Sequence, residues 1–425
     1  MFFARVQRQF LIAFRNPNIV KSIVFFKVIP GQIAKTKFWL VCLLIIGVWA
    51  ANSAFAATNA NINWMVFSDV NKKNWSGHIE SYDPSRLYVK SSTVLTDSAP
   101  KKILVIVAKK SGSYKLALNR LLEVFHQEKY AAKFEVVNIA GSEEVGLALL
   151  TQAHLQGFDL IFTMGSESAA LVHKYYKNGP LPVVTSINKD PVTLGQVTSY
   201  KEGSGTNIAT TTLNVPVDIQ LTYLFQLNPK LKHVVLLYNR NHKQVVATEV
   251  KPFRKAMIEQ GIRVIDVTVE SRDKAREQLE KSLPDAMGLL REIDPTLNHS
   301  VVWVTSSTAI FSNLDIVSQY SQDVAVVSTN PNAVKAGGES AVVAIGIDRR
   351  NNAHLAAIYA LRILRDKENP GDLEVGVVTP PDIALNFKVA RELGLKIPFT
   401  FLEGASFVYD YNGQLVRSFG QDVQP

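Results

Sequence analysis

The sequence predicts an α/β protein made of two doubly wound parallel-sheet lobes that are joined by a hinge of several chain crossings. From Lys101 onward, short β-branched runs alternate with longer stretches of helical period, which is typical of βαβ units. A polar, glycine-bearing stretch at 201–212 interrupts this alternation, and a second series then begins. With 425 residues, 47% of them hydrophobic, the chain is long enough to bury two cores.

The first lobe begins with a strand, a polar loop and a helix. The run 103–107 is β-branched, and Leu118, Leu121, Leu122 and Phe125 recur at the spacing of one helix face. The same order repeats, with strands expected near 134–137, 160–163 and 181–185 and helices near 143–156 and 168–177.

The second lobe repeats the pattern, with helices expected near 218–227, 245–259, 272–292 and 309–320 and strands near 233–237, 263–267, 301–304 and 324–327. Gly337-Gly338 and the apolar run 341–345 predict a second crossing between the lobes. A helix over 353–364 and a third crossing near Val377 are expected to follow.

These patterns predict the domain boundaries. The first lobe comprises 101–214 with about 342–373, and the second comprises 215–341 with about 374–400. Residues 57–100 form an N-terminal extension and 401–425 a C-terminal tail, in which Asn412-Gly413 predicts a hairpin turn.

The formal charge of +9 lies mostly at the start of the chain. Residues 1–56 hold seven basic side chains and no acidic ones, which leaves 39 basic against 37 acidic residues in the remainder. A body with so little net charge offers no concentrated basic field for phosphates, and the sequence has no zinc-finger, RRM or basic-helix signature. We therefore expect no nucleic-acid partner.

The start of the chain has the order of a secretory signal. Lys35 and Lys37 precede an apolar run over 38–49, and Ala54-Phe55-Ala56 is a small-residue cleavage pattern before Ala57. We predict a signal peptide over 1–56 with an unusually long N-region, and a periplasmic protein. Alternatively, the uncharged segment from Phe38 to Ala57 stays uncleaved as a membrane anchor.

Candidate ligand-binding residues are the polar side chains that follow predicted strands, where helix N-termini offer unpaired N–H groups. Ser166, Ser168 and Asn239 are the strongest, since each follows a strand directly and precedes a helical pattern. For every candidate the alternative is a capping or turn residue. The full set is Ser111, Ser113, Tyr114, Gly165, Ser166, Ser168, Ser186, Asn188, Asp190, Tyr238, Asn239, Arg240, Thr305, Ser306, Ser307, Thr329, Asn330 and Asp348.

Some candidates suggest a chemical role. Arg240 could hold a carboxylate through two hydrogen bonds, or be a solvated surface arginine. Asp190 and Asp348 could recognise an ammonium group, although Asp190 precedes Pro191 and is equally a turn former. Tyr114 and Tyr238 could stack on an aromatic ligand, or belong to the core.

Enzymatic and cofactor-binding functions find little support. Gly165-Ser166-Glu167-Ser168 resembles a hydrolase nucleophile elbow but lacks its second glycine. No His-x-x-x-His spacing appears, and no Gly-x-Gly-x-x-Gly follows a predicted strand. We predict a protein that is not an enzyme and that has no cofactor and no metal.

Several segments form an ordered series along the chain: 182–185, 190–192, 227–229, 234–239, 328–330, 344–348, 385–390 and 393–395. In this order they resemble the TrpX-type family of ABC-transporter substrate-binding proteins, which have the type I periplasmic-binding fold. The sequence departs from the pattern of that family at Ala209-Thr210 and at Arg240-Asn241-His242.

The resemblance implies that the lobes close on a small polar solute, such as an amino acid or a related carboxylate. The partner it implies is the permease of an inner-membrane ABC importer. A membrane sensor kinase or cyclase that reads the closed form is the alternative. We expect a monomer.

Overall fold

The computed structural model describes residues 64–80, 82–92 and 99–423. The predicted signal peptide over 1–56 and the alternative anchor from Phe38 to Ala57 lie outside these residues. Within the described ranges, no helix combines the length and the apolar character that crossing a membrane requires.

The first sheet has seven strands in the order β1-β2-β4-β3-β5-β6-β7. Its centre is parallel, because β3 pairs in parallel with both β4 and β5, and β6 continues the series to β7. The strands are β1 Trp75–Glu80, β2 Asp83–Ser91, β3 Lys101–Val107, β4 Ala132–Asn138, β5 Leu160–Met164, β6 Val183–Ser186 and β7 Ile208–Thr210.

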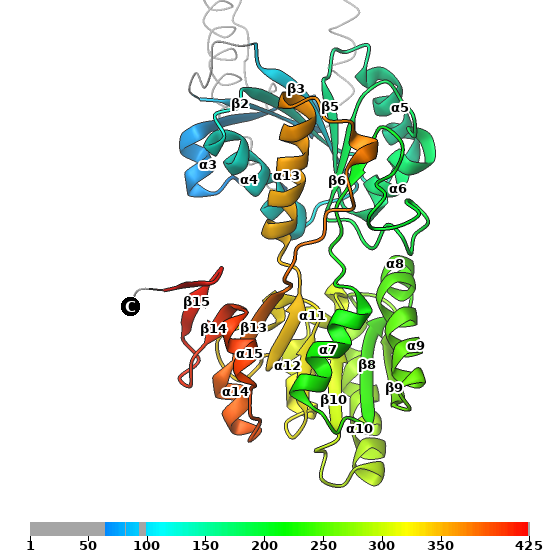
Figure 1. Ribbon diagram of the computed structural model, residues 1–425, viewed down its shortest axis with the longest axis vertical. Coiled ribbons are helices and arrows are strands. Elements are labelled where there is room, and N and C mark those ends of the chain that lie inside the picture. Colours follow the sequence, from blue (N-terminus) through cyan, green and yellow to red (C-terminus); the bar gives the residue numbers. More distant parts are fainter. Residues whose placement is uncertain (1–63, 81, 93–98, 424–425) are drawn as a thin grey trace, which may run out of the picture. The chain divides into compact units, whose positions relative to one another are not determined.

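Helices cover both faces of this sheet. Alternate residues of β3 point to opposite faces, so Ile103 and Val105 pack with α4 and α13 while Leu104 and Ile106 pack with α5 and α6. Figure 1 shows α4 and α13 side by side on one face. The helices are α3 Asp69–Asn74, α4 Gly112–Gln127, α5 Glu143–Ala153, α6 Ser166–Tyr175 and α13 Arg349–Arg365.

The second sheet has nine strands in the order β16-β15-β14-β13-β12-β11-β10-β8-β9. The pairs among β8 to β12 are parallel, and β13 joins β12 antiparallel. Its strands are β8 His233–Asn239, β9 Arg263–Val269, β10 Ser300–Val304, β11 Ala325–Ser328, β12 Val343–Gly346, β13 Asp382–Asn386, β14 Ala405–Tyr409, β15 Leu415–Ser418 and β16 Gln421–Asp422.

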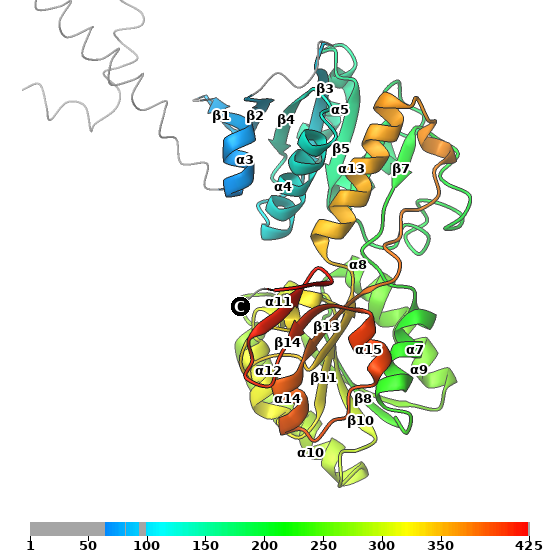
Figure 2. The ribbon, with the colours of Figure 1, turned by 60° about the vertical axis from the view of Figure 1, so that its left-hand side comes forward.

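Two apolar cores cover the faces of the second sheet. One lies under α10, α11 and α12, and the other lies under α7, α9, α14 and α15 (Figure 2). In the second core Phe253 stacks on Trp303, with ring centroids 4.4 Å apart. The helices are α7 Val217–Leu227, α9 Lys251–Glu259, α10 Ala275–Ile293, α11 Thr308–Phe311, α12 Leu314–Tyr320, α14 Phe387–Glu392 and α15 Phe399–Glu403.

Two helices that were expected to be continuous are interrupted. The helix predicted over 309–320 divides into α11 and α12. At the break the Asn313 backbone is not helical, with φ −127° and ψ 35°, and its side-chain amide donates to Ala309 O at 2.8 Å. The helix predicted over 245–259 contains a π turn, η2 Val246–Val250, between the short α8 Lys243–Val245 and α9. That π turn includes Glu249, whose side chain becomes important at the site.

The second crossing lies later than predicted. The sequence predicts that 341–345 belongs to the crossing, but these residues are buried, and from Val343 they form β12, which pairs with β11 on one side and β13 on the other. Strands buried on both faces read as continuous apolar runs, so such a run does not distinguish a strand from a buried linker. The chain leaves the second sheet after Gly346 and enters α13, which packs on the first sheet.

The first and third crossings run beside each other. Thr211 forms a parallel bridge with Gly376, and the N–H of Thr212 donates to Gly376 O at 3.0 Å. The chain then enters the second sheet at β13. This agrees with a crossing near Val377.

Both segments predicted to lie outside the lobes extend the sheets. In the described part of 57–100, β2 pairs antiparallel with β4, and Leu87 is buried opposite Val136. In the C-terminal segment, β14 pairs in parallel with β13, and Phe401 is fully buried. The hairpin turn predicted at Asn412-Gly413 is confirmed, since it joins the antiparallel strands β14 and β15.

Candidate functional site

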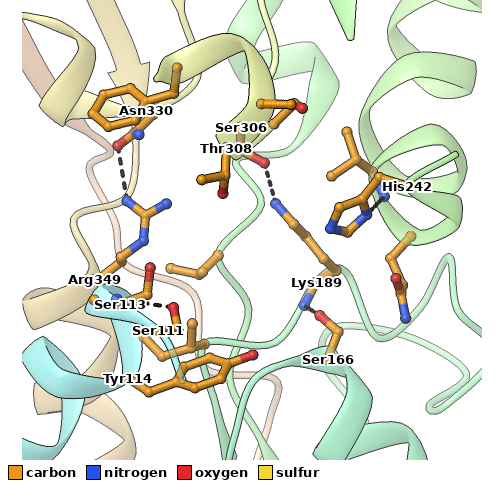
Figure 3. A pocket seen from close by; sticks show the side chains of 18 of the residues that line it. Ser111, Ser113, Tyr114, Ser166, Lys189, His242, Ser306, Thr308, Asn330 and Arg349 are labelled. Carbon is orange, nitrogen blue, oxygen red and sulfur yellow. Dashed lines mark hydrogen bonds between the residues drawn. The ribbon is translucent and has the colours of Figure 1, made fainter. Parts of the chain in front are cut away.

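A cavity of about 780 Å³ lies where the carboxyl ends of strands from both sheets meet (Figure 3). Loops after parallel strands present polar groups at such an edge. Eight of the predicted binding residues line it: Ser111, Ser113, Tyr114, Ser166, Asn239, Ser306, Ser307 and Asn330.

The first turn of α4 forms one wall of the cavity. The Ser111 hydroxyl accepts a hydrogen bond from Ser113 N at 3.2 Å, which caps the helix and leaves the amide end of α4 beside the cavity. Tyr114 follows in the same turn, and burial raises the pKa of its hydroxyl to about 12. Its phenol is therefore neutral at physiological pH.

Gly165 makes room for Tyr114 rather than lining the cavity itself. It has φ +101°, and a Cβ atom at this position would lie 2.0 Å from the Tyr114 hydroxyl. A glycine is needed there both for its backbone conformation and for the close approach of the tyrosine. The role predicted for Gly165 thus becomes one of positioning.

A buried ion pair lies on another wall. Lys189 Nζ contacts both the Glu249 carboxylate and the Ser306 hydroxyl, while Ser306 N donates to Glu249 Oε2 at 2.9 Å. Burial alone would raise the pKa of Glu249, but Lys189 and Ser306 outweigh burial and hold this pKa below its ordinary value. The Lys189 backbone is also fixed, because its N–H donates to Ser166 Oγ at 2.9 Å.

Arg349 brings a second cation to the cavity. It is the first residue of α13, and its Nη1 donates to Asn330 Oδ1 at 3.0 Å (Figure 3). Burial lowers the pKa of the guanidinium, although Asp348 and Glu249 act in the opposite direction. Arginine stays protonated in proteins, so the group remains a cation.

The remaining charges of the cavity are more exposed. Lys109 forms a 2.8 Å ion pair with Glu167, and Lys110 and Arg272 have exposed side chains. His242 is the lining histidine, and burial followed by the charge of Lys189 lowers its pKa. Cations therefore outnumber carboxylates among the described lining residues.

Apolar side chains complete the lining. Leu213 and Ile187 come from the segments that follow β7 and β6, and Phe311 comes from α11. Together with Tyr114 they offer a surface for an apolar or aromatic ligand group.

Ten predicted residues fall outside the lining, and three of them cap or brace the backbone. Ser168 Oγ donates to Met164 O at 2.9 Å inside α6, and Thr305 Oγ1 donates to Leu237 O at 2.9 Å. Asp190 caps a turn by accepting from Val192 N at 2.9 Å. The capping and turn alternative describes these contacts, and Gly165 also belongs to the ten.

Three more belong to hydrogen-bond networks, and of these Ser186 and Asn188 are buried. Ser186 Oγ donates to Asn352 Oδ1 at 3.2 Å, and Asn188 Nδ2 donates to Gln196 Oε1 at 2.7 Å. Thr329 Oγ1 donates to Glu249 Oε2 at 3.3 Å, so it supports the carboxylate that pairs with Lys189.

The last three belong to other charge clusters. Asp348 caps α13 by accepting from Arg350 N at 2.8 Å. Arg240 forms an exposed ion pair with Glu270, and the Tyr238 hydroxyl accepts from Arg254 at 3.2 Å. The carboxylate and ammonium roles predicted for Arg240, Asp190 and Asp348 find no counterpart in the lining of the cavity.

The cavity also contains charged residues that the sequence reasoning did not select. Lys189 lies between the candidates Asn188 and Asp190, and Arg349 directly follows Asp348. Asn188 and Asp190 were selected because they follow a predicted strand, and Asp348 because it lies near the predicted hinge. Each criterion therefore led to a residue adjacent to the charged one. For Arg349 the missing information was the position of the crossing, because that residue begins α13 immediately after it.

Comparison with protein families gives a match over residues 103–408 to the model described as ABC transporter substrate binding protein. Comparison with curated proteins gives no match.

Solved structures share the fold at low sequence identity. The ligand-free, open structure of CD0873, a substrate binding protein with adhesive properties from Clostridium difficile, is 19% identical, with a TM-score of 0.55 over 72% of this chain and 98% of that chain. The ABC domain in complex with L-Trp from Streptococcus pneumonia is 20% identical, with a TM-score of 0.56 over 73% and 100%. A conserved domain protein from Vibrio cholerae is 17% identical, also with a TM-score of 0.56 over 73% and 100%. The fold is thus that of type I periplasmic binding proteins.

Proposed function

Because the chain belongs to the family of ABC transporter substrate-binding proteins, we propose that it captures a small anionic solute in the cavity and delivers it to an ABC permease in the inner membrane. One observation supports an anionic solute in particular. The half-buried Arg349 lines a cavity in which cations outnumber carboxylates. Arginine recognises carboxylates through its planar fork of donors.

The cavity suits binding without covalent chemistry. Its volume of about 780 Å³ is in the range of small-molecule sites, and its polar groups come from loops and helix ends of both sheets. Binding that favours a closed arrangement of the lobes would give the permease a ligand-dependent surface. This family consists of binding proteins, and we propose no enzymatic activity.

The finer parts of the proposal rest on different supports. Delivery to a permease, in preference to a membrane sensor, rests on the family description. A periplasmic location and cleavage before Ala57 rest on the signal-like order at the start of the sequence. The narrower TrpX-type likeness rests on the ordered segments alone, and a monomer is the expectation that accompanies it.

The test is a thermal-shift screen of residues 62–425, which form one compact unit. The panel contains amino acids, simple carboxylates, sugars, nucleosides and purines. A solute that binds only the folded state must raise the melting temperature, and we expect selective shifts of several degrees from anionic solutes. Shifts from sugars or nucleosides alone would contradict the anionic class, and the absence of any shift would contradict solute capture.

A further inference from the structure

The Arg349 guanidinium restricts the class of ligand that fits the cavity. Within the described ranges it donates a 3.0 Å hydrogen bond to Asn330, and no carboxylate forms an ion pair with it. Asp348 and Glu249 are the carboxylates whose charge acts on Arg349, but they form their ion pairs with other cations: Glu249 with Lys189, and Asp348 Oδ1 with Arg350. A half-buried cation without a counter-ion favours an anion brought by the ligand.

The pocket offers much less to a positive charge. Of the described lining residues, Glu167 is the carboxylate, and it already pairs with Lys109 at 2.8 Å. An ammonium group enclosed here would lose its hydration and find no free carboxylate. The cavity is therefore matched to a carboxylate and poorly matched to the zwitterion of an α-amino acid.

The remainder of the lining indicates the rest of the ligand. Tyr114, Leu213 and Phe311 provide apolar and aromatic surface. Ser307 also lines the cavity, and its hydroxyl is buried without a hydrogen-bond partner in the described structure. Buried polar groups are normally satisfied, so Ser307 is available to a polar atom of the ligand.

We propose that the cavity selects a monocarboxylate with an apolar body and without an ammonium group, and that Arg349 determines this selection. The proposal rests on the proposed solute-binding function. It differs from that function in excluding α-amino acids as preferred ligands.

The experiment is isothermal titration of residues 62–425 with matched sets of probes. One set is 3-phenylpropionate, 3-phenylpropionamide and L-phenylalanine, and the other is hexanoate, hexanamide and L-norleucine. Within a set, the three molecules differ in the charge of the acid group or in the α-ammonium group. We expect each carboxylate to bind at least tenfold more tightly than its amide and its amino acid.

The variant Arg349→Gln tests the residue itself. Hydrogen bonds to charged groups contribute enough to predict a loss of carboxylate affinity of about tenfold to a hundredfold, with the weak amide binding unchanged. Arg240→Gln is the matched control, because Arg240 lies outside the cavity in an exposed pair with Glu270. Equal melting temperatures of both variants and the parent would show that folding is intact.

The outcomes separate the two proposals. An amino acid that binds as tightly as its deaminated analogue, or a carboxylate whose affinity Arg349→Gln leaves unchanged, overturns the selection but leaves solute capture standing. A broad screen whose ligands all lack a carboxylate does the same. If these probes fail and the screen finds another ammonium-free carboxylate that Arg349→Gln weakens, the selection is supported. A screen without any ligand counts against both proposals.

Discussion

At the scale of single residues, the ion pair of Lys189 with Glu249 is notable because both charged groups are buried. Only 12% of the Lys189 side chain and 5% of the Glu249 side chain are exposed. A buried pair is weak evidence of net stabilisation, but removal of one partner leaves an uncompensated charge. Ser306 and Thr329 supply additional hydrogen bonds to the carboxylate.

We expect Lys189→Met to lower the free energy of unfolding by about 3 kcal/mol at pH 7, because the Glu249 carboxylate would remain buried without its cation. The control Lys109→Met removes an exposed pair with Glu167 and should cost less than about 1 kcal/mol. Chemical denaturation measures both values. An equal loss in the free energy of unfolding for the two variants would contradict the expected penalty for a buried, unpaired Glu249 carboxylate.

The same pair gives stability a pH dependence. The pKa of Glu249 is lowered in the folded state, so its contribution is fully present above the ordinary value of 4.5 and is lost as the pH falls below it. Denaturation of the parent between pH 6 and about pH 3 should show this loss. In Glu249→Gln this component should be absent, and an unchanged pH profile in that variant would contradict the assignment.

At the scale of elements, Asn352 ties α13 to the strand ends of the first sheet. It is fully buried, and its Oδ1 accepts from Ile187 N at 2.8 Å and from Thr211 Oγ1 at 3.3 Å. Its Nδ2 donates to Thr212 O at 2.9 Å. One side chain thus holds the helix that carries Arg349 against the segments that carry Ile187 and Leu213.

We expect Asn352→Ala to destabilise the protein by about 3 kcal/mol, because buried backbone and side-chain groups lose their partner. The adjacent Asn351→Ala removes the 2.8 Å hydrogen bond to Asp382 Oδ1 and should cost about 1 kcal/mol. The melting temperatures of the two variants compare them directly. A smaller loss in Asn352→Ala than in Asn351→Ala would contradict this role.

At the scale of the whole molecule, each sheet contains strands in addition to those of its βαβ units. β1 and β2 extend the first sheet, and β14 to β16 extend the second beyond β13. β13 is buried along its length, with Ile383 and Leu385 fully covered. The C-terminal segment therefore contributes side chains to the same apolar core as β13.

We expect truncation before Ala405 to give an insoluble or aggregated product, because loss of β14 uncovers the edge of the apolar strand β13. Truncation before Leu415 removes β15 and β16 but keeps β14, and should leave a soluble, cooperatively folding protein. Size-exclusion chromatography and thermal melting distinguish the two products. A soluble, folded product from the shorter chain would show that β14 is dispensable.

Local patterns in the sequence determined the fold class, because β-branched runs and helical periodicity are properties of neighbouring residues. They also located the loops that carry eight of the lining residues, since polar groups after parallel strands converge on one edge. The hairpin at Asn412-Gly413 was readable for the same reason, as its turn preference lies in two adjacent residues.

Tertiary structure decided what depends on partners far apart in the chain. An apolar run such as 341–345 has the pattern of a strand and equally that of a buried crossing. Only pairing with β11 and β13 shows that its residues from Val343 onward belong to strand β12. Lys189 and Glu249 are 60 residues apart, and no local pattern marks them as a pair. Arg349 is left with its charge toward the cavity because the nearby carboxylates are engaged elsewhere. The general substrate-binding family and the strand-end loops could thus be predicted from the sequence. The charge balance of the cavity could not, because it arises only when side chains distant in the chain come together.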